Sequence, residues 1–171
     1  MSDTASPNPS IHAAANADVS DTRVVLVDLD GALGDTRPLW DAWLAEAARV
    51  LDVDPDTLPE DRVEAAAILD RGGGNWRVLL ERFAADRAPV YLRPAADASG
   101  ALRRLAAAGA RIGLFSDAPE ELLQVAAAQL GAARRAEAIE AGADALERLR
   151  GSLPGVPTVV RTRSELLEAA T

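Results

Sequence analysis

The sequence predicts an α/β fold built around a parallel sheet. Two short apolar runs, at residues 24–27 and 111–115, each lead into a polar residue, as buried parallel strands do. Longer segments with helical spacing of apolar side chains lie between and after these runs, so strands alternate with helices. The length of 171 residues suits one domain, or one domain that carries an insert.

The first half of the chain holds one predicted strand and then only helices. Residues 1–20 contain Ser, Pro, Asn and Ala without hydrophobic periodicity, so we expect a mobile tail, with order beginning near Arg23. After the strand, the periodicity predicts helices at residues 38–51, 62–70 and 76–85. We therefore expect residues 37–93 to form a helical insert in an α/β core made of residues 21–36 and 94–171.

The second half of the chain returns to alternating helices and strands. The predicted strands cover residues 111–115, 136–140 and 157–161. The predicted helices cover residues 96–108, a segment opened by 116–121 and running to Leu130, residues 144–150, and residues 164–170 with Ser164 as the cap. The result is a sheet of about four strands flanked by helices.

The composition excludes several chemistries. The chain has no Cys and a single His, His12 in the predicted tail, and all 18 basic residues are Arg. Disulfides, thiolate metal sites, Ser-His-Asp hydrolysis and lysine Schiff bases are thereby ruled out or disfavoured. The net charge of −9 without a basic block argues against nucleic-acid or anionic-membrane partners. With no apolar run of membrane length and no secretory signal, we expect a cytoplasmic protein.

Polar side chains follow the first two strands at the edge where parallel-sheet proteins bind ligands. Asp28 and Asp30 come after the first strand and are followed by Gly31. Ser116 and Asp117 come after the second strand. A carboxylate pair beside a glycine turn suits Mg²⁺ and phosphate, because Mg²⁺ prefers one or two carboxylates with waters and phosphate oxygens.

Two segments carry a resemblance to a known family. VVLVDLDGALGDT resembles the first motif of the haloacid dehalogenase superfamily, and RIGLFSD resembles its second motif. The helical insert stands where this family places a type-1 cap, as in members similar to phosphoglycolate phosphatase. The resemblance covers about residues 22–171. It implies a Rossmann-like sheet with strand order 4-1-2-3 and a Mg²⁺-dependent phosphatase that acts on a small phosphorylated metabolite.

The resemblance also implies roles for individual residues. Asp28 would be the nucleophile that takes up the phosphoryl group and would bind Mg²⁺. Asp30 would be the general acid and base and would share the metal through its carbonyl. The remaining assignments are Ser116 and Arg134 as further catalytic groups, and Gly31, Asp117, Trp76 and Arg77 as substrate contacts.

Departures from the family pattern support a competing hypothesis. The chain has no Lys for the third motif, for which Arg134 or Arg135 would have to substitute. The fourth motif needs acids after the last strand, but Thr162 stands between two Arg there, and Glu165 is the only nearby carboxylate. The alternative is therefore a catalytically impaired relative that acts as a binding or regulatory module, or a remnant that binds no ligand.

Each candidate residue also has a plain structural interpretation. Residues 116–121 are a good helix start, so Ser116 and Asp117 are as well explained by capping as by catalysis. Trp40, Trp43 and Phe83 lie at helical spacing and are expected in the core.

Overall fold

The computed structural model describes residues 22–72 and 74–171, so the predicted tail at residues 1–20 lies outside the described residues. Four strands form one parallel sheet in the order β3-β2-β1-β4, which confirms the predicted topology. The strands are β1 (Arg23–Asp28), β2 (Arg111–Ser116), β3 (Ala138–Ala141) and β4 (Val156–Val160).

The first strand is the centre of the fold. Residues Val24 to Val27 have no exposed surface, as expected for an apolar strand with neighbours on both sides. Asp28 is paired in register with Phe115 of β2, and Val27 is paired with Val160 of β4. Because the strands are parallel, the residues that follow β1, β2, β3 and β4 all meet at the same edge.

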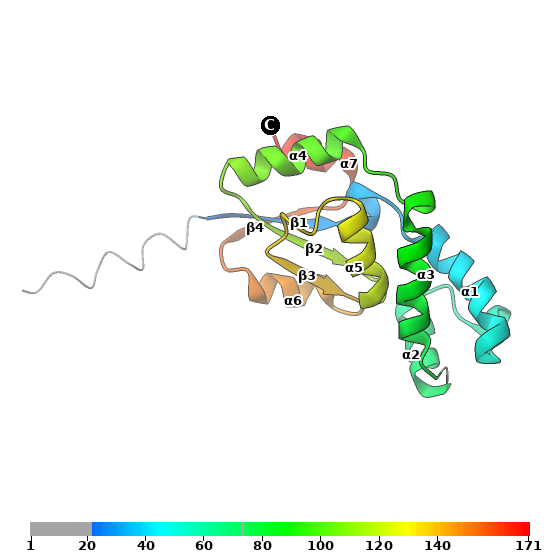
Figure 1. Ribbon diagram of the computed structural model, residues 1–171. Coiled ribbons are helices and arrows are strands. Elements are labelled where there is room, and N and C mark those ends of the chain that lie inside the picture. The colour runs from blue at the N-terminus through cyan, green and yellow to red at the C-terminus, as the bar shows by residue number, and fades with distance from the viewer. Residues whose placement is uncertain (1–21, 73) are drawn as a thin grey trace, which may run out of the picture.

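Helices cover both faces of the sheet (Figure 1). One apolar cluster joins Val25, Val27, Ile112 and Leu114 to helices α4, α5 and α7, and a second joins Val24 to α6. These helices are α4 (Ala96–Ala107), α5 (Glu120–Gln129), α6 (Ala145–Ser152) and α7 (Arg163–Ala169).

Three helices of the 37–93 segment, which we call the helical insert, stand together beside the core (Figure 1). They are α1 (Arg37–Leu51), α2 (Arg62–Gly72) and α3 (Trp76–Tyr91). Trp40, Trp43 and Trp76 pack against one another with ring centroids 5.0–6.3 Å apart, and all three are buried. They belong to the same apolar cluster as one face of the sheet, so the insert shares its core with the α/β domain.

Local details differ from the prediction at several helix ends. Helix α3 continues six residues past the expected end at residue 85 and contains Pro89 in its last turn. The cap of α7 is Thr162 rather than Ser164, and Thr162 forms a reciprocal capping box with Glu165. Two segments expected only as a loop and a turn contain short helical turns, a π-helical turn at Leu29–Leu33 and a 3-10 turn at Pro55–Thr57. No helix within the described residues is long and apolar enough to cross a membrane.

Candidate functional site

Asp28 is the last residue of β1 and lines a cavity at the carboxyl ends of the strands. Its Oδ1 accepts a hydrogen bond of 3.1 Å from the backbone N–H of Asp30, and its side chain is 23% exposed. The guanidinium of Arg161 lies 3.8 Å from Asp28 Oδ2 and 5.5 Å from the ring centroid of Phe115. Asp28 is therefore a carboxylate at the surface of the site with one loosely placed cation beside it.

Asp30 lies in the π-helical turn after β1 and is almost fully buried. Its Oδ1 accepts hydrogen bonds from the backbone N–H and hydroxyl of Thr36, at 2.7 and 2.6 Å. Its Oδ2 accepts from Arg62 Nη2 at 2.6 Å and from Ser116 Oγ at 2.7 Å. These four bonds use the roughly four acceptor positions of an ionised carboxylate, so Asp30 has no capacity left for a ligand.

The helical insert supplies the cation that faces Asp30. Arg62 is the first residue of α2 and is 3% exposed. Besides its ion pair with Asp30, it donates from Nη1 to Thr36 Oγ1 at 2.6 Å and from Nη2 to Asp117 Oδ1. Ser116 Oγ lies 3.5 Å from the same Nη2. We call these residues the Arg62 cluster: Asp30, Thr36, Arg62, Ser116 and Asp117.

The pKa values of the two carboxylates at the end of β1 are shifted in opposite directions. Burial raises the pKa of Asp28, as does the negative charge of Asp30, and the nearby N–H groups and Arg161 only partly oppose this rise. Burial alone would also raise the pKa of Asp30, but the charge of Arg62 and the hydrogen bonds from Thr36, Arg62 and Ser116 lower it below its usual range. Asp30 is thus held as a carboxylate and is unsuited to donate a proton in this state.

Gly31 connects the two carboxylates to the last strand. A Cβ placed on Gly31 would lie only 1.8 Å from the backbone carbonyl oxygen of Arg161. Only glycine fits this close approach, because a backbone oxygen cannot move aside as a flexible side chain can. Gly31 therefore fixes the position of the Asp28–Asp30 turn against the end of β4.

Three cavities border these residues. One, of about 450 Å³, which we call the mouth cavity, is lined by Asp28, Arg37, Ser116, Asp117, Arg161 and residues 142 and 144–147. A second, of about 560 Å³, lies between the insert and the core, where Arg62, Arg77, Asp117 and Arg148 are among the lining residues. The third, of about 490 Å³, is lined by Arg37, Arg62 and Asp117 among others. Asp117 borders all three cavities, so the Arg62–Asp117 contact lies where they adjoin.

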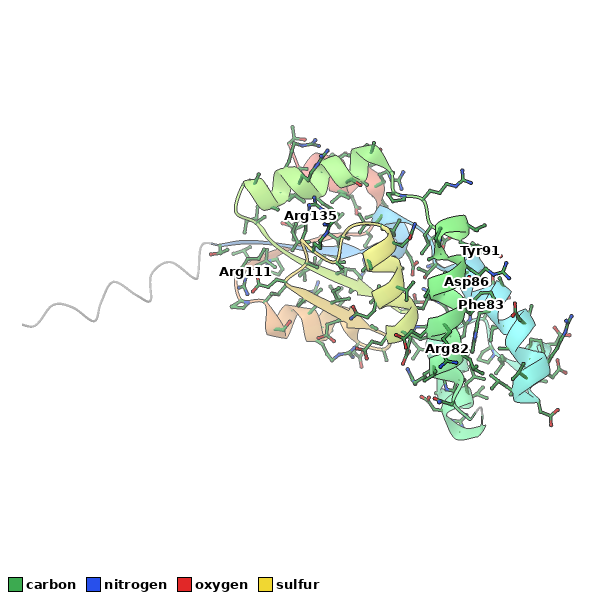
Figure 2. All side chains as sticks on the ribbon, in the orientation of Figure 1. Arg82, Phe83, Asp86, Tyr91, Arg111 and Arg135 are labelled. Atoms are coloured by element: carbon green, nitrogen blue, oxygen red, sulfur yellow. The ribbon has the colours of Figure 1, made fainter. Side chains whose placement is uncertain are left out.

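The structure brings together most of the residues expected at the sheet edge, but not Arg134. Asp28, Asp30, Ser116 and Asp117 gather there as predicted. Arg134 lies in the loop that enters β3 and is exposed. This loop is at the N-terminal ends of the strands, whereas the site is at their carboxyl ends. Figure 2 shows Arg135, the neighbour of Arg134, and also Arg111, on the side of the molecule away from the helical insert. The cation that contacts Asp30 is Arg62, which the sequence presented only as the start of a helix.

The two substrate contacts expected in the insert have different surroundings. Trp76 is 1% exposed and donates from Nε1 to Asp70 at 3.0 Å, so it is a core residue. Arg77 lines the cavity of about 560 Å³ and bridges Asp70 and Glu121 of α5 with contacts of 3.0 and 3.1 Å. Arg77 therefore remains near a cavity, whereas Trp76 does not.

The side chains do not fit a Mg²⁺ site. Within the described residues, no three His, Cys, Asp or Glu side chains gather closely enough to hold a metal. The carboxylate of Glu165 accepts hydrogen bonds from two backbone N–H groups at the start of its own helix, at 2.6 and 3.0 Å. Asp30 and Asp117 both contact Arg62 instead. Among the acidic side chains that follow β1 and β2, only the Asp28 carboxylate is left for a hard cation, and Asp28 has Arg161 beside it.

Comparison with known proteins shows similarity in structure but not in sequence. No family model and no curated protein matches the chain. The protein CbbY from Rhodobacter sphaeroides, solved in complex with phosphate, has a TM-score of 0.59 at 16% identity over 87% of this chain and 83% of CbbY. A mutant of CbbY, solved in complex with xylulose-1,5-bisphosphate, has a TM-score of 0.57 at 17% identity over the same shares of each chain.

A candidate haloacid dehalogenase-like hydrolase from Burkholderia xenovorans is also similar. It has a TM-score of 0.52 at 19% identity over 87% of this chain and 76% of the other. This chain therefore shares the fold of these solved structures, which is the fold that its two motifs implied.

Proposed function

We propose that this chain is a binding or regulatory module on the haloacid dehalogenase fold, which binds a small phosphorylated molecule without hydrolysing it efficiently. The observation that carries this is the state of Asp30, which is buried, ion-paired with Arg62 and hydrogen-bonded at every acceptor position. A general acid must carry a proton and reach its substrate, and Asp30 does neither in this arrangement. The acids that would complete a Mg²⁺ site are engaged elsewhere or replaced.

The mouth cavity supports binding of a phosphoryl group. Arg37 and Arg161 both line it and are each 58% exposed. Arg37 is paired with the exposed Asp35 at 3.2 Å and Arg161 with Asp28 at 3.8 Å, and such solvated pairs are weak enough to be exchanged for a phosphoryl oxygen. Four acidic residues line the same cavity and oppose an anion, namely Asp28, Asp117, Asp144 and Glu147. We therefore expect weak binding, with a Kd on the order of 1 mM for inorganic phosphate, and tighter binding for a phosphorylated sugar that also fills the cavity.

Isothermal titration with inorganic phosphate and a panel of phosphorylated sugars tests the binding. Arg161→Gln should weaken every phosphorylated ligand about tenfold, because it removes one charged contact to the phosphoryl group. Arg134→Gln removes the same charge at the N-terminal ends of the strands and is the matched control. Equal affinities for the wild type and Arg161→Gln, or no binding of any phosphorylated compound, would refute the binding site.

A second candidate, Mg²⁺-dependent hydrolysis through Asp28, is favoured by one observation. Asp28 is the carboxylate that stays accessible at the mouth, in the first-motif position, with a backbone N–H orienting it. Phosphate release from phosphomonoesters, with and without Mg²⁺, separates the candidates when the wild type is compared with Asp28→Asn. We expect no release above background in either chain. Release that needs both Mg²⁺ and Asp28 would establish the hydrolase instead.

A further inference from the structure

Arg62 is the most deeply buried cation that the structure describes, and it joins the insert to the core. Its Nη2 contacts Asp30 Oδ2 at 2.6 Å, contacts Asp117 Oδ1, and lies 3.5 Å from Ser116 Oγ. One nitrogen of the insert thus occupies the point where oxygens from two strand ends of the core converge. Its partners lie 26 to 55 residues away along the chain, so the contact exists only while the insert is docked.

We propose that Arg62 is an internal counter-ion that holds the helical insert on the core and competes with any external cation for the oxygens of Asp30 and Asp117. A buried carboxylate needs a positive partner, because an uncompensated charge in a low-dielectric site is costly. Arg62 supplies that charge from within the chain. The site then fits Mg²⁺ poorly because Arg62 already pairs with the carboxylates of Asp30 and Asp117.

The arrangement has the form of an autoinhibitory contact. While Arg62 is seated, Asp30 is saturated and Asp117 is turned toward the insert. Withdrawal of α2 would remove the positive partner of both carboxylates at once, while Asp30 would keep its hydrogen bonds from Thr36 and Ser116. This role of Arg62 goes beyond the proposed function, since it holds whether or not the mouth cavity binds a phosphorylated molecule.

A second ion pair between insert and core provides a matched control. Arg77 of α3 contacts Glu121 of α5 at 3.1 Å, with the two side chains 40% and 21% exposed. This pair also crosses from insert to core, but it lies outside the Arg62 cluster and is partly solvated. A general loss of contact between insert and core should appear in Arg77→Ala as well as in Arg62→Ala, whereas loss of the counter-ion should appear only in the latter.

Chemical rescue of Arg62→Ala tests the proposal. Removing the side chain leaves a space shaped for a guanidinium, and we expect the melting temperature to fall by roughly 10 °C. Guanidinium chloride at about 10 mM, far below denaturing concentrations, should restore several degrees relative to NaCl of equal ionic strength. The wild type and Arg77→Ala should show no such gain. Equal responses in all three proteins, or no response in Arg62→Ala, would overturn the proposal.

Titration with Mg²⁺ alone gives a second readout. With Arg62 removed, Asp30 and Asp117 are free to attract a cation, so Mg²⁺ in the millimolar range should raise the melting temperature of Arg62→Ala but not that of the wild type. A wild type that gains as much stability from Mg²⁺ as the variant would refute the competition.

The experiment remains decisive if Arg62→Ala does not fold in plain buffer. Recovery of the folded state is then followed by circular dichroism on adding about 10 mM guanidinium, and absence of recovery counts against the proposal. Arg62→Lys keeps the charge but not the planar group, so it should fold and respond less to guanidinium than Arg62→Ala does. None of these readouts measures phosphate binding or release, so their failure is distinct from failure of the proposed function.

Discussion

Two carboxylates of the same type, two residues apart, have opposite surroundings in this protein. Asp28 is 23% exposed, has the exposed Arg161 as its loosely placed partner, and has a raised pKa. Asp30 is buried, paired at 2.6 Å with the equally buried Arg62, and has a lowered pKa. Position at the end of a strand therefore does not fix the chemistry of a carboxylate. The partner brought by a distant segment fixes it.

Substitution of the two carboxylates should separate them most strongly. Asp30→Asn removes the partner of a buried cation and should lower the free energy of unfolding by roughly 3 kcal/mol, since Asp117 compensates only in part. Asp28→Asn should change it by less than about 1 kcal/mol, because its partner is solvated. Urea unfolding of the wild type and both variants measures the difference. Similar losses in the two variants would show that the buried pair stabilises the fold no more than the exposed pair does.

The pH dependence of stability sharpens the same contrast. The pKa of Asp30 lies below its ordinary value of 3.8, so its stabilising effect is fully present above that pH and is lost as the pH falls through the lowered pKa. The gap between the wild type and Asp30→Asn should therefore shrink between about pH 5 and pH 2.5. Asp28 has a raised pKa, so its ionisation opposes folding as the pH rises above 3.8.

Asp28→Asn is the control for this titration. We expect it to be as stable as the wild type, or slightly more stable, at neutral pH, with no gain at low pH. Unfolding midpoints collected at several pH values for the three proteins provide the measurement. A gap for Asp30→Asn that widened toward low pH would contradict the assignment of a lowered pKa.

The sequence predicted the sheet and the edge at which the site lies, because both follow from local patterns. Apolar runs gave the strands, and the acids after β1 and the hydroxyl after β2 marked the strand ends. Arg62 was not predicted as a site residue, since an Arg at a helix start carries no signal of a contact with Asp30, 32 residues away. The cap residue of helix α7 was likewise not determined by the local sequence.

Both Thr162 and Ser164 are good cap residues, and only the backbone turn at the end of β4 selects the first. Tertiary contacts decided each case in which local chemistry left two outcomes open. The expectation for Arg134 rested on order along the chain alone, and the loop before β3 places this residue at the N-terminal ends of the strands.

The smallest predicted effect concerns the partner of Asp28. Arg161→Gln removes a pair 3.8 Å long whose cation is 58% exposed, so the free energy of unfolding should fall by less than about 0.5 kcal/mol. This small loss should vanish when NaCl is raised to about 0.5 M, because salt screens exposed charges. Arg134→Gln, which removes an exposed charge at the N-terminal ends of the strands, corrects for the change in net charge.

A loss above about 1 kcal/mol that persisted in high salt would mean that Arg161 holds Asp28 as Arg62 holds Asp30. Arg161 and Asp28 would then form a second tightly held ion pair rather than a loose, solvated one. In that event Arg161 would have no freedom to turn toward a phosphoryl group, and the binding proposed for the mouth cavity would lose its principal cation.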